Sequence, residues 1–132
     1  MASQLKVDTL TGVTTAGSID VTGEGNSTTT NLQQGLAKAW GQFQGTGTVA
    51  VTNSSNFSSI TDNGTGSYSM FFLNSMSGSY SVVSSTGESN TSGIVRVGGT
   101  DASSVLVNTR VSSSGSSYDD QKIYMAVHGD LA

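Results

Sequence analysis

Apolar and small polar residues alternate along most of the chain after about residue 38, and a period of two is typical of half-buried β-strands. The longest such run carries Val105, Val107, Thr109 and Val111 at every second position. β-Branched and aromatic residues, which dominate these runs, favour extended backbone. We therefore expect strands at residues 48–52, 67–72, 80–82, 94–97, 105–111 and 123–127.

Short segments rich in glycine, asparagine and serine separate these runs, among them TDNGTG, MSGS and SSSGSS. Glycine and asparagine adopt positive φ at low cost, so such segments form turns. Seven or eight strands at this spacing predict an all-β fold, an antiparallel β-sandwich. Its core is expected to contain Val49, Val51, Phe72, Val105, Val107, Ile123 and Met125.

The N-terminal part of the chain differs from the rest, because all nine aromatic residues follow Leu36. We expect an extended arm at residues 1–37 and a β-sandwich body at residues 38–132. The aliphatic residues of the arm recur at spacings of about three, or else residues 5–7 pair with residues 19–21 as a hairpin. They are too few to offset the ordering entropy of the segment, so the arm should be disordered or ordered only against partner chains. The residues expected to anchor the arm are Leu5, Val7, Leu10, Val13, Ile19 and Val21.

The segment NLQQGLAKAW, residues 31–40, predicts a short helical turn at the end of the arm. Asn31 is placed to cap the N-terminus of this turn, and the Gln34 side chain is placed to hydrogen-bond back to the backbone N–H of Asn31. Leu32 and Leu36 are four residues apart and share one helix face. Because so short a helix is marginal alone, we expect copies of the chain to meet at a neck formed by Leu32, Leu36 and Trp40.

Composition argues against several classes of function. Serine and threonine provide 41 residues, whereas charged residues make up only 11%, against about 25% in ordinary soluble domains. The absence of cysteine removes disulfides, iron–sulfur clusters and thiol nucleophiles. Five basic residues against nine acidic ones argue against nucleic acid as a partner. No apolar run approaches the ~18 residues of a membrane span, so membrane insertion is not expected, and MASQLKVDTL lacks the pattern of a secretory signal.

The residues that carry enzymatic chemistry are few, and the sequence does not pair them. His128 is the only histidine and ends the last expected strand, whereas a nucleophile needs a positioned base. Asp62, Asp101 and the pair Asp119–Asp120 lie in turn sequences, where aspartate stabilises turns more often than it forms a glycosidase pair. The dipeptide Asn63–Gly64 predicts a hairpin turn, and its surroundings lack the spaced oxygen ligands of a calcium loop. We expect no enzyme, and no catalytic, cofactor or metal site.

The segment AWGQFQGTGTVAVTNSSNFSSITDNGTGSYSMFF, residues 39–72, resembles a module of tail-fibre and related appendage proteins of aquatic, especially marine, bacteriophages. That module is similar to A-W-x-x-F-x-G-T-G-T-V, then a short variable loop, then S-S-I-T-D-N-G-T-G-x-Y. The N-terminal LKVDTLTG and the C-terminal VAVHGD are also similar to such chains. The variable loop usually carries charged residues and here reads TNSSNF, so if this loop touches a receptor we expect a different target. The resemblance implies a virion protein that forms a homotrimer.

From these patterns and the resemblance we expect a structural component of a bacteriophage particle, a short tail fibre or appendage subunit. It would be made in the host cytoplasm, incorporated into the virion and released by lysis. The alternatives are a fibre or decoration protein on the capsid, and a free carbohydrate-binding module, which would not need the arm. The expected partners are two sister copies, other virion proteins that hold the arm, and a glycan or protein of the host surface.

Polar loops and aromatic residues are the candidates for host contact. Trp40 and Tyr68 lie in patterned segments, so we expect them in the core or at an interface rather than as platforms for sugars. Tyr118 lies among loop residues and is the better candidate for exposure. Loops at 54–56, 87–92 and 114–119 are expected to face away from the particle. Their candidate contact residues are Ser54, Ser55, Asn56, Asn90 and Tyr118.

Overall fold

The chain divides into two compact units, Met1–Leu36 and Ala37–Ala132, in a computed structural model that describes residues 4–13, 19–23, 28–86 and 93–132. We call the first unit the arm and the second the body; the division falls one residue before the expected end of the arm. The described part of the arm contains β1 (Asp20–Thr22), β2 (Thr29–Asn31) and α1 (Leu32–Gly35). The short helical turn predicted from NLQQG is therefore present.

Strands β1 and β2 form an antiparallel pair in which Val21 lies opposite Thr30. Backbone hydrogen bonds from Gly23 N to Thr28 O and from Leu32 N to Ile19 O close the pair. The hairpin considered between residues 5–7 and 19–21 is therefore wrong. The observed partner strand is closer in sequence, so joining it costs less loop-closure entropy, and the intervening segment is rich in turn-forming residues.

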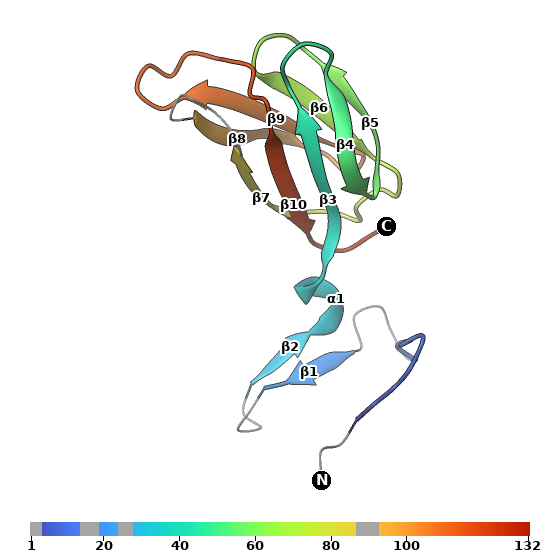
Figure 1. Ribbon diagram of the computed structural model, residues 1–132. Coiled ribbons are helices and arrows are strands. Elements are labelled where there is room, and N and C mark those ends of the chain that lie inside the picture. Colours follow the sequence, from blue (N-terminus) through green and yellow to red (C-terminus); the bar gives the residue numbers. More distant parts are fainter. Residues whose placement is uncertain (1–3, 14–18, 24–27, 87–92) are drawn as a thin grey trace. The chain divides into compact units, whose positions relative to one another are not determined.

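The body is an antiparallel β-sandwich, with two four-stranded sheets packed against each other (Figure 1). The first sheet has the strand order β4-β3-β10-β7, and the second has the order β5-β6-β9-β8. The all-β fold expected from the sequence is confirmed. The strand bounds are β3 (Ala37–Gln44), β4 (Ala50–Ser55), β5 (Phe57–Asp62), β6 (Ser67–Phe72), β7 (Ser81–Thr86), β8 (Gly93–Thr100), β9 (Ser104–Val111) and β10 (Ile123–His128).

Side chains from both sheets meet in one hydrophobic core. Its largest fully buried side chains include Phe43, Tyr68 and Met70, and the rings of Phe43 and Tyr68 pack edge to face with centroids 5.1 Å apart. Five of the seven expected core residues are buried, and the other two are partly buried and pack against the core. The buried residues are Phe72, Val105, Val107, Ile123 and Met125, and the partly buried ones are Val49 and Val51.

The chain crosses from the first sheet to the second at Asn56, the single residue between β4 and β5. Its φ of 59° lies in the left-handed region, which asparagine enters more readily than most residues with a side chain. The Asn56 side chain accepts a hydrogen bond from the backbone nitrogen of Asn74 at 2.7 Å and donates one to the Asn74 carbonyl at 3.0 Å. Asn56 therefore fixes the crossing.

Strand β5 is the strand that hydrophobic alternation does not reveal. Its apolar residues, Phe57 and Ile60, are three positions apart. The register against β6 shifts between Phe57 and Ser59, so both apolar side chains pack against the core. A bulge of this kind adds one residue and breaks the period of two.

The connection between β9 and β10 forms hydrogen bonds with the two turns at the end of the sandwich where β3 ends. The Tyr68 hydroxyl donates a hydrogen bond to a carboxylate oxygen of Asp119 at 2.7 Å, and the backbone nitrogen of Gly66 donates to the same oxygen at 2.7 Å. The backbone nitrogen of Gly45 donates to the carbonyl of Asp120 at 2.9 Å. The β3–β4 and β5–β6 turns are thus both held by Asp119 and Asp120.

Candidate functional site

The segments expected to contact a receptor do not share one end of the body. Ser54 and Ser55 are the last residues of β4, which runs antiparallel to β3 and so returns to the end where β3 begins. Tyr118 lies in the β9–β10 connection at the opposite end. These two segments therefore lie at opposite ends of the body, and their contact with a receptor stays a prediction. The third segment, residues 87–92 with Asn90, lies outside the described residues.

Tyr118 is held within the body and is not a free aromatic platform. It is half-buried, its hydroxyl donates to the Asp120 carboxylate at 2.8 Å, and its carbonyl accepts a hydrogen bond from the Thr109 hydroxyl. Gly93 lies so close that a side chain there would overlap the phenol. Like Asn56 at the sheet crossing, Tyr118 has a structural role.

The three residues expected at an oligomer neck lie in different elements. Leu32 begins α1, Leu36 follows its end and is 55% exposed, and Trp40 belongs to β3 in the body. The helix stops at Gly35, consistent with the low helix propensity of glycine. Trp40 therefore belongs to a strand of the body and does not continue the helical turn that begins at Leu32.

Aspartates stabilise turns, as their sequence contexts predicted. The Asp62 carboxylate accepts a hydrogen bond from the backbone nitrogen of Gly64 at 2.8 Å. The Asp101 carboxylate accepts hydrogen bonds from the backbone nitrogens of Ser103 and Ser104, each at 2.7 Å, and from their hydroxyls. Hydrogen bonds from Ser103, and then from Ser104, lower the pKa of Asp101, because they stabilise its charged form.

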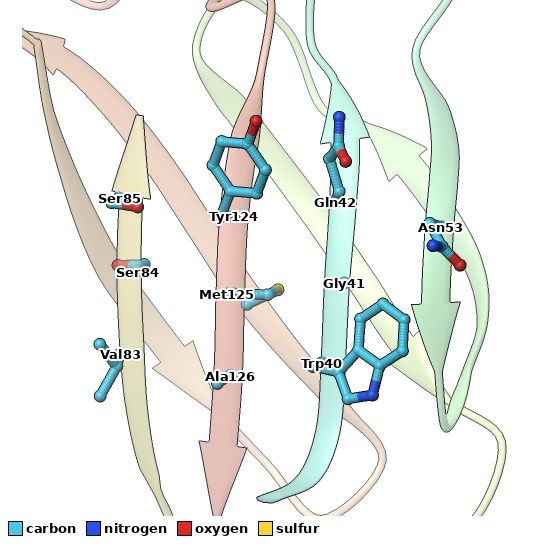
Figure 2. Close-up of a pocket in the computed structure, with 10 residues that line it drawn as sticks. All are labelled: Trp40, Gly41, Gln42, Asn53, Val83, Ser84, Ser85, Tyr124, Met125 and Ala126. Carbon is cyan, nitrogen blue, oxygen red and sulfur yellow. The ribbon is translucent and has the colours of Figure 1, made fainter. Parts of the chain in front are cut away.

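A groove crosses the outward face of the first sheet (Figure 2). It has a volume of about 300 Å³ and is lined by residues from all four strands of that sheet. Strand pairing aligns the outward side chains in two rows across these strands. The first row is Ser55, Trp40, Ala126 and Val83, and the second is Asn53, Gln42, Tyr124 and Ser85.

Two aromatic rings and two amides face this groove. Trp40 is 43% exposed and Tyr124 is 38% exposed. Figure 2 shows Gln42 on β3 between Tyr124 on β10 and Asn53 on β4, with the Trp40 ring on the β4 side of β3. None of these four side chains forms a hydrogen bond with another described residue. The groove therefore combines accessible aromatic surface with amide groups whose hydrogen-bonding capacity is not used within the described chain.

The groove is electrically neutral, in contrast to a hollow on the other sheet. No aspartate, glutamate, lysine, arginine or histidine is among the described residues that line it. On the second sheet, Arg96 lies opposite Asn108, and these residues together with Arg110 line a hollow of about 210 Å³. Arg110 donates a hydrogen bond to the Gly115 carbonyl at 2.9 Å. The two hollows thus differ in charge, since only the one on the second sheet is lined by arginines.

The tyrosines with shifted pKa values lie away from the groove. Burial, followed by the hydrogen bond to Asp119, raises the pKa of Tyr68. Burial, followed by the charge of Asp101, raises the pKa of Tyr80, whose hydroxyl donates to the Ser104 carbonyl at 2.7 Å. These shifts belong to the structural networks that hold the loops.

The groove does not follow from the patterning of the sequence, because a tryptophan in a patterned segment is expected in the core or at an interface. Ala39 and Gly41 point inward and are buried, while the large indole points outward. A side chain at Gly41 would begin only 3.2 Å from Met70 and Phe57, so the inward position has no room for a large residue. The inward series Ala39, Gly41 and Phe43 is the signal that places Trp40 on the outer face.

No helix among the described residues is long and apolar enough to cross a membrane. Among the same residues, no three histidine, cysteine, aspartate or glutamate side chains are grouped so that they could hold a metal ion. Comparisons of the chain with protein-family models, with curated proteins and with solved structures found no match.

Proposed function

We propose that this chain is a structural subunit of a bacteriophage particle, a short tail fibre or other appendage, whose arm joins it to partner chains. The observation that carries this proposal is the exposure of the arm's apolar side chains. Leu5 is 81% exposed and Val13 is 95% exposed. Val7, Leu10 and Val21 are each more than half exposed.

The arm and the body differ in how they use apolar residues. All the buried hydrophobic residues of the described chain lie in the body, so the described arm has no core of its own. Burying one large aliphatic side chain contributes about 1.5–3 kcal/mol. Contact with a partner would therefore stabilise the arm through several side chains at once. Several exposed apolar side chains in one segment of the chain favour contact with a partner.

The proposed assembly is a homotrimer held on the virion by the arm. Leu32 and Leu36 form its neck, and the trimeric state follows from the resemblance of residues 39–72 to phage appendage modules. The body contributes a hydroxyl-rich surface with its own core, which suits a protein displayed outside a cell. A fibre or decoration protein on the capsid would also need the arm for attachment to the particle. A free carbohydrate-binding module would not need the arm.

Removing residues 1–36 tests this function. Particles are produced with either the full chain or residues 37–132, and the copy number per particle is measured by quantitative mass spectrometry. We expect the shortened chain to fold, because it retains the whole core, and to be missing from particles. Antibody labelling of the full chain on intact particles then distinguishes tail from capsid. Normal copy number without the arm would disprove arm attachment.

A set of point variants separates a specific arm contact from general surface hydrophobicity. Leu5→Ser and Val13→Ser each remove an exposed apolar side chain from the arm. Leu73→Ser is the matched control, because Leu73 is 70% exposed but belongs to the body. We expect reduced incorporation for the two arm variants and normal incorporation for the control. Equal incorporation of all three would mean that these arm residues make no assembly contact.

A further inference from the structure

We propose that the groove on the outward face of the first sheet binds a neutral pyranose of a host-surface glycan. This inference deepens the proposed function, on which it rests, by naming the class of molecule that the displayed body contacts. The site consists of the Trp40 and Tyr124 rings together with the amides of Gln42 and Asn53.

The polar groups of the groove match the hydroxyls of a sugar. Each amide offers a carbonyl acceptor and two N–H donors. Adjacent hydroxyls of a pyranose both donate and accept, so one planar amide can engage two of them. Gln42 and Asn53 lie opposite each other on paired strands, which brings both amides to the same row. Neither has a hydrogen-bond partner among the described residues.

The aromatic rings match the apolar face of the same ligand. One face of many pyranoses carries only C–H groups, whose weak positive charge favours the negative face of an aromatic ring. Trp40 and Tyr124 lie on neighbouring strands in adjacent rows of the sheet. Both rings are exposed; Tyr124 shares the row of the two amides, and Trp40 lies in the adjacent row. One ligand can therefore make apolar contacts with the rings and hydrogen bonds with the amides. This combination of an apolar lining and a few polar groups is typical of ligand sites.

The charge and size of the groove limit the kinds of ligand that it can bind. No charged side chain lines it, whereas an acidic sugar or a phosphate would favour arginine or lysine. Arg96 and Arg110 are on the other sheet and therefore cannot contact a ligand in this groove. The volume of about 300 Å³ is at the small end of the range for ligand pockets. A short neutral segment of a glycan fits these limits.

The surface is a poor match for a second copy of the same groove. Stable protein interfaces bury about 800 Å² on each partner and have a centre that is mostly apolar. Here the second row carries the polar side chains of Asn53, Gln42 and Ser85 beside Tyr124, so polar groups border the apolar area provided by Trp40 and Val83. Two concave faces placed together would also leave a void between them, which forfeits contact energy.

The single tryptophan of the chain allows a direct test. The full-length protein is labelled with ¹⁵N, and the one indole N–H signal, from Trp40, is followed while methyl glycosides of glucose, galactose, mannose and N-acetylglucosamine are added. Glucuronic acid is titrated in parallel as an acidic probe. We expect a saturable shift with at least one neutral glycoside. Binding by a single groove should be weak, and several copies on one particle would strengthen it through avidity.

Variants in the groove and on the opposite sheet test the assignment. Tyr124→Ala should abolish measurable binding, and Gln42→Ala should weaken it roughly tenfold through the lost hydrogen bonds. Both side chains point outward, so circular dichroism should show an intact fold. The matched control is Arg96→Ala, which removes an outward side chain from the other sheet and should leave neutral-sugar binding unchanged.

Three results would overturn the proposal. The first is the absence of a saturable shift with every neutral glycoside. The second is binding of the acidic probe alone, with loss of that binding in Arg96→Ala. The third is a change in oligomeric state caused by Trp40→Ala, which would assign the face to contact between copies. Particle incorporation is measured separately, so failed sugar binding with normal arm-dependent assembly would reject the groove and retain the proposed function.

Discussion

Gly45→Ala is the substitution whose effect follows most directly from the packing of the body. A side chain at Gly45 would overlap the hydroxyl oxygen of Tyr68. It would also lie 2.8 Å from the ring carbon Cζ of Tyr68 and 2.9 Å from the carbonyl oxygen of Asp120. The ring is fully buried and the carbonyl belongs to the backbone, so neither can move freely. We therefore expect Gly45→Ala to destabilise the body.

The expected loss has two sources. Forcing one methyl group into a close-packed core costs about 1–3 kcal/mol. Moving the Tyr68 ring also weakens the hydrogen bond of 2.7 Å to Asp119, and a bond to a charged acceptor contributes about 1.5–3 kcal/mol. The reduced freedom of the unfolded chain offsets about 0.4–1 kcal/mol. The net decrease in the free energy of unfolding should be about 3 kcal/mol, a large part of the ~5–15 kcal/mol of a typical domain.

Equilibrium unfolding in urea, followed by far-ultraviolet circular dichroism, measures this decrease through the midpoint and the slope of the transition. Gly78→Ala is the matched control, because a side chain there has no neighbouring atom within 4 Å. We expect the control to be neutral or slightly stabilising. If Gly45→Ala and Gly78→Ala unfold at the same urea concentration, the close contact inferred at Gly45 is wrong.

A double-mutant cycle identifies the atom responsible. Tyr68→Phe removes the hydroxyl that the new methyl group would meet, but it leaves Cζ and the Asp120 carbonyl in place. The combined variant should therefore be less destabilised than the sum of the single variants by about 1 kcal/mol or more, without full recovery. Strict additivity would show that the Tyr68 hydroxyl is not the obstacle.

The remaining predictions concern the core, the sheet crossing, the buried phenol and metal independence. Val107→Asp should abolish folding as seen by circular dichroism, because it places an unpaired charge at a fully buried position, whereas a cooperative unfolding transition in this variant would contradict the core assignment. Asn56→Ala should be less stable than Asn56→Gly by about 1 kcal/mol in urea unfolding, because both lose the bonds to Asn74 but only glycine adopts φ of 59° freely; equal stability would refute the role of φ. The raised pKa of Tyr68 stabilises the fold fully below the unfolded-state pKa of about 10, and this contribution is lost as pH rises toward the higher folded-state pKa, so wild-type melting temperature should fall above about pH 10. Tyr68→Phe should fall less steeply over that range, and an unchanged slope would reject the linkage. Chelators should leave the unfolding midpoint of the wild type unchanged, and a lowered midpoint would reveal a stabilising metal.

The strands with regular alternation could be predicted from sequence because one face of each supplies the core. Strands β9 and β10 follow this rule along most of their length, with buried and less buried residues in turn. Strand β5 could not be found this way, because the bulge between Phe57 and Ser59 places two apolar residues with odd spacing on the same side. Alternation therefore identifies flat strands better than bulged ones.

The candidate site was harder to predict than the fold because it depends on pairing between distant strands. Trp40 and Gln42 are close in sequence, but Tyr124 joins them only through the pairing of β10 with β3. The role of Asn56 was also not predictable from sequence. Its surroundings read as a loop that contacts a receptor, whereas Asn56 fixes the crossing between the two sheets. Composition indicated polar loops, whereas hydrogen bonding determined which of those residues have structural roles.

The mass of the full chain in solution, compared with that of residues 37–132, shows whether the arm holds copies of the chain together. Sedimentation equilibrium on both proteins at the same concentration measures it. We predict a full-length trimer of about 40 kDa, three times the chain mass of 13.4 kDa, and a folded monomer for residues 37–132. A full-length monomer, or a trimer that persists without residues 1–36, would contradict assembly through the arm.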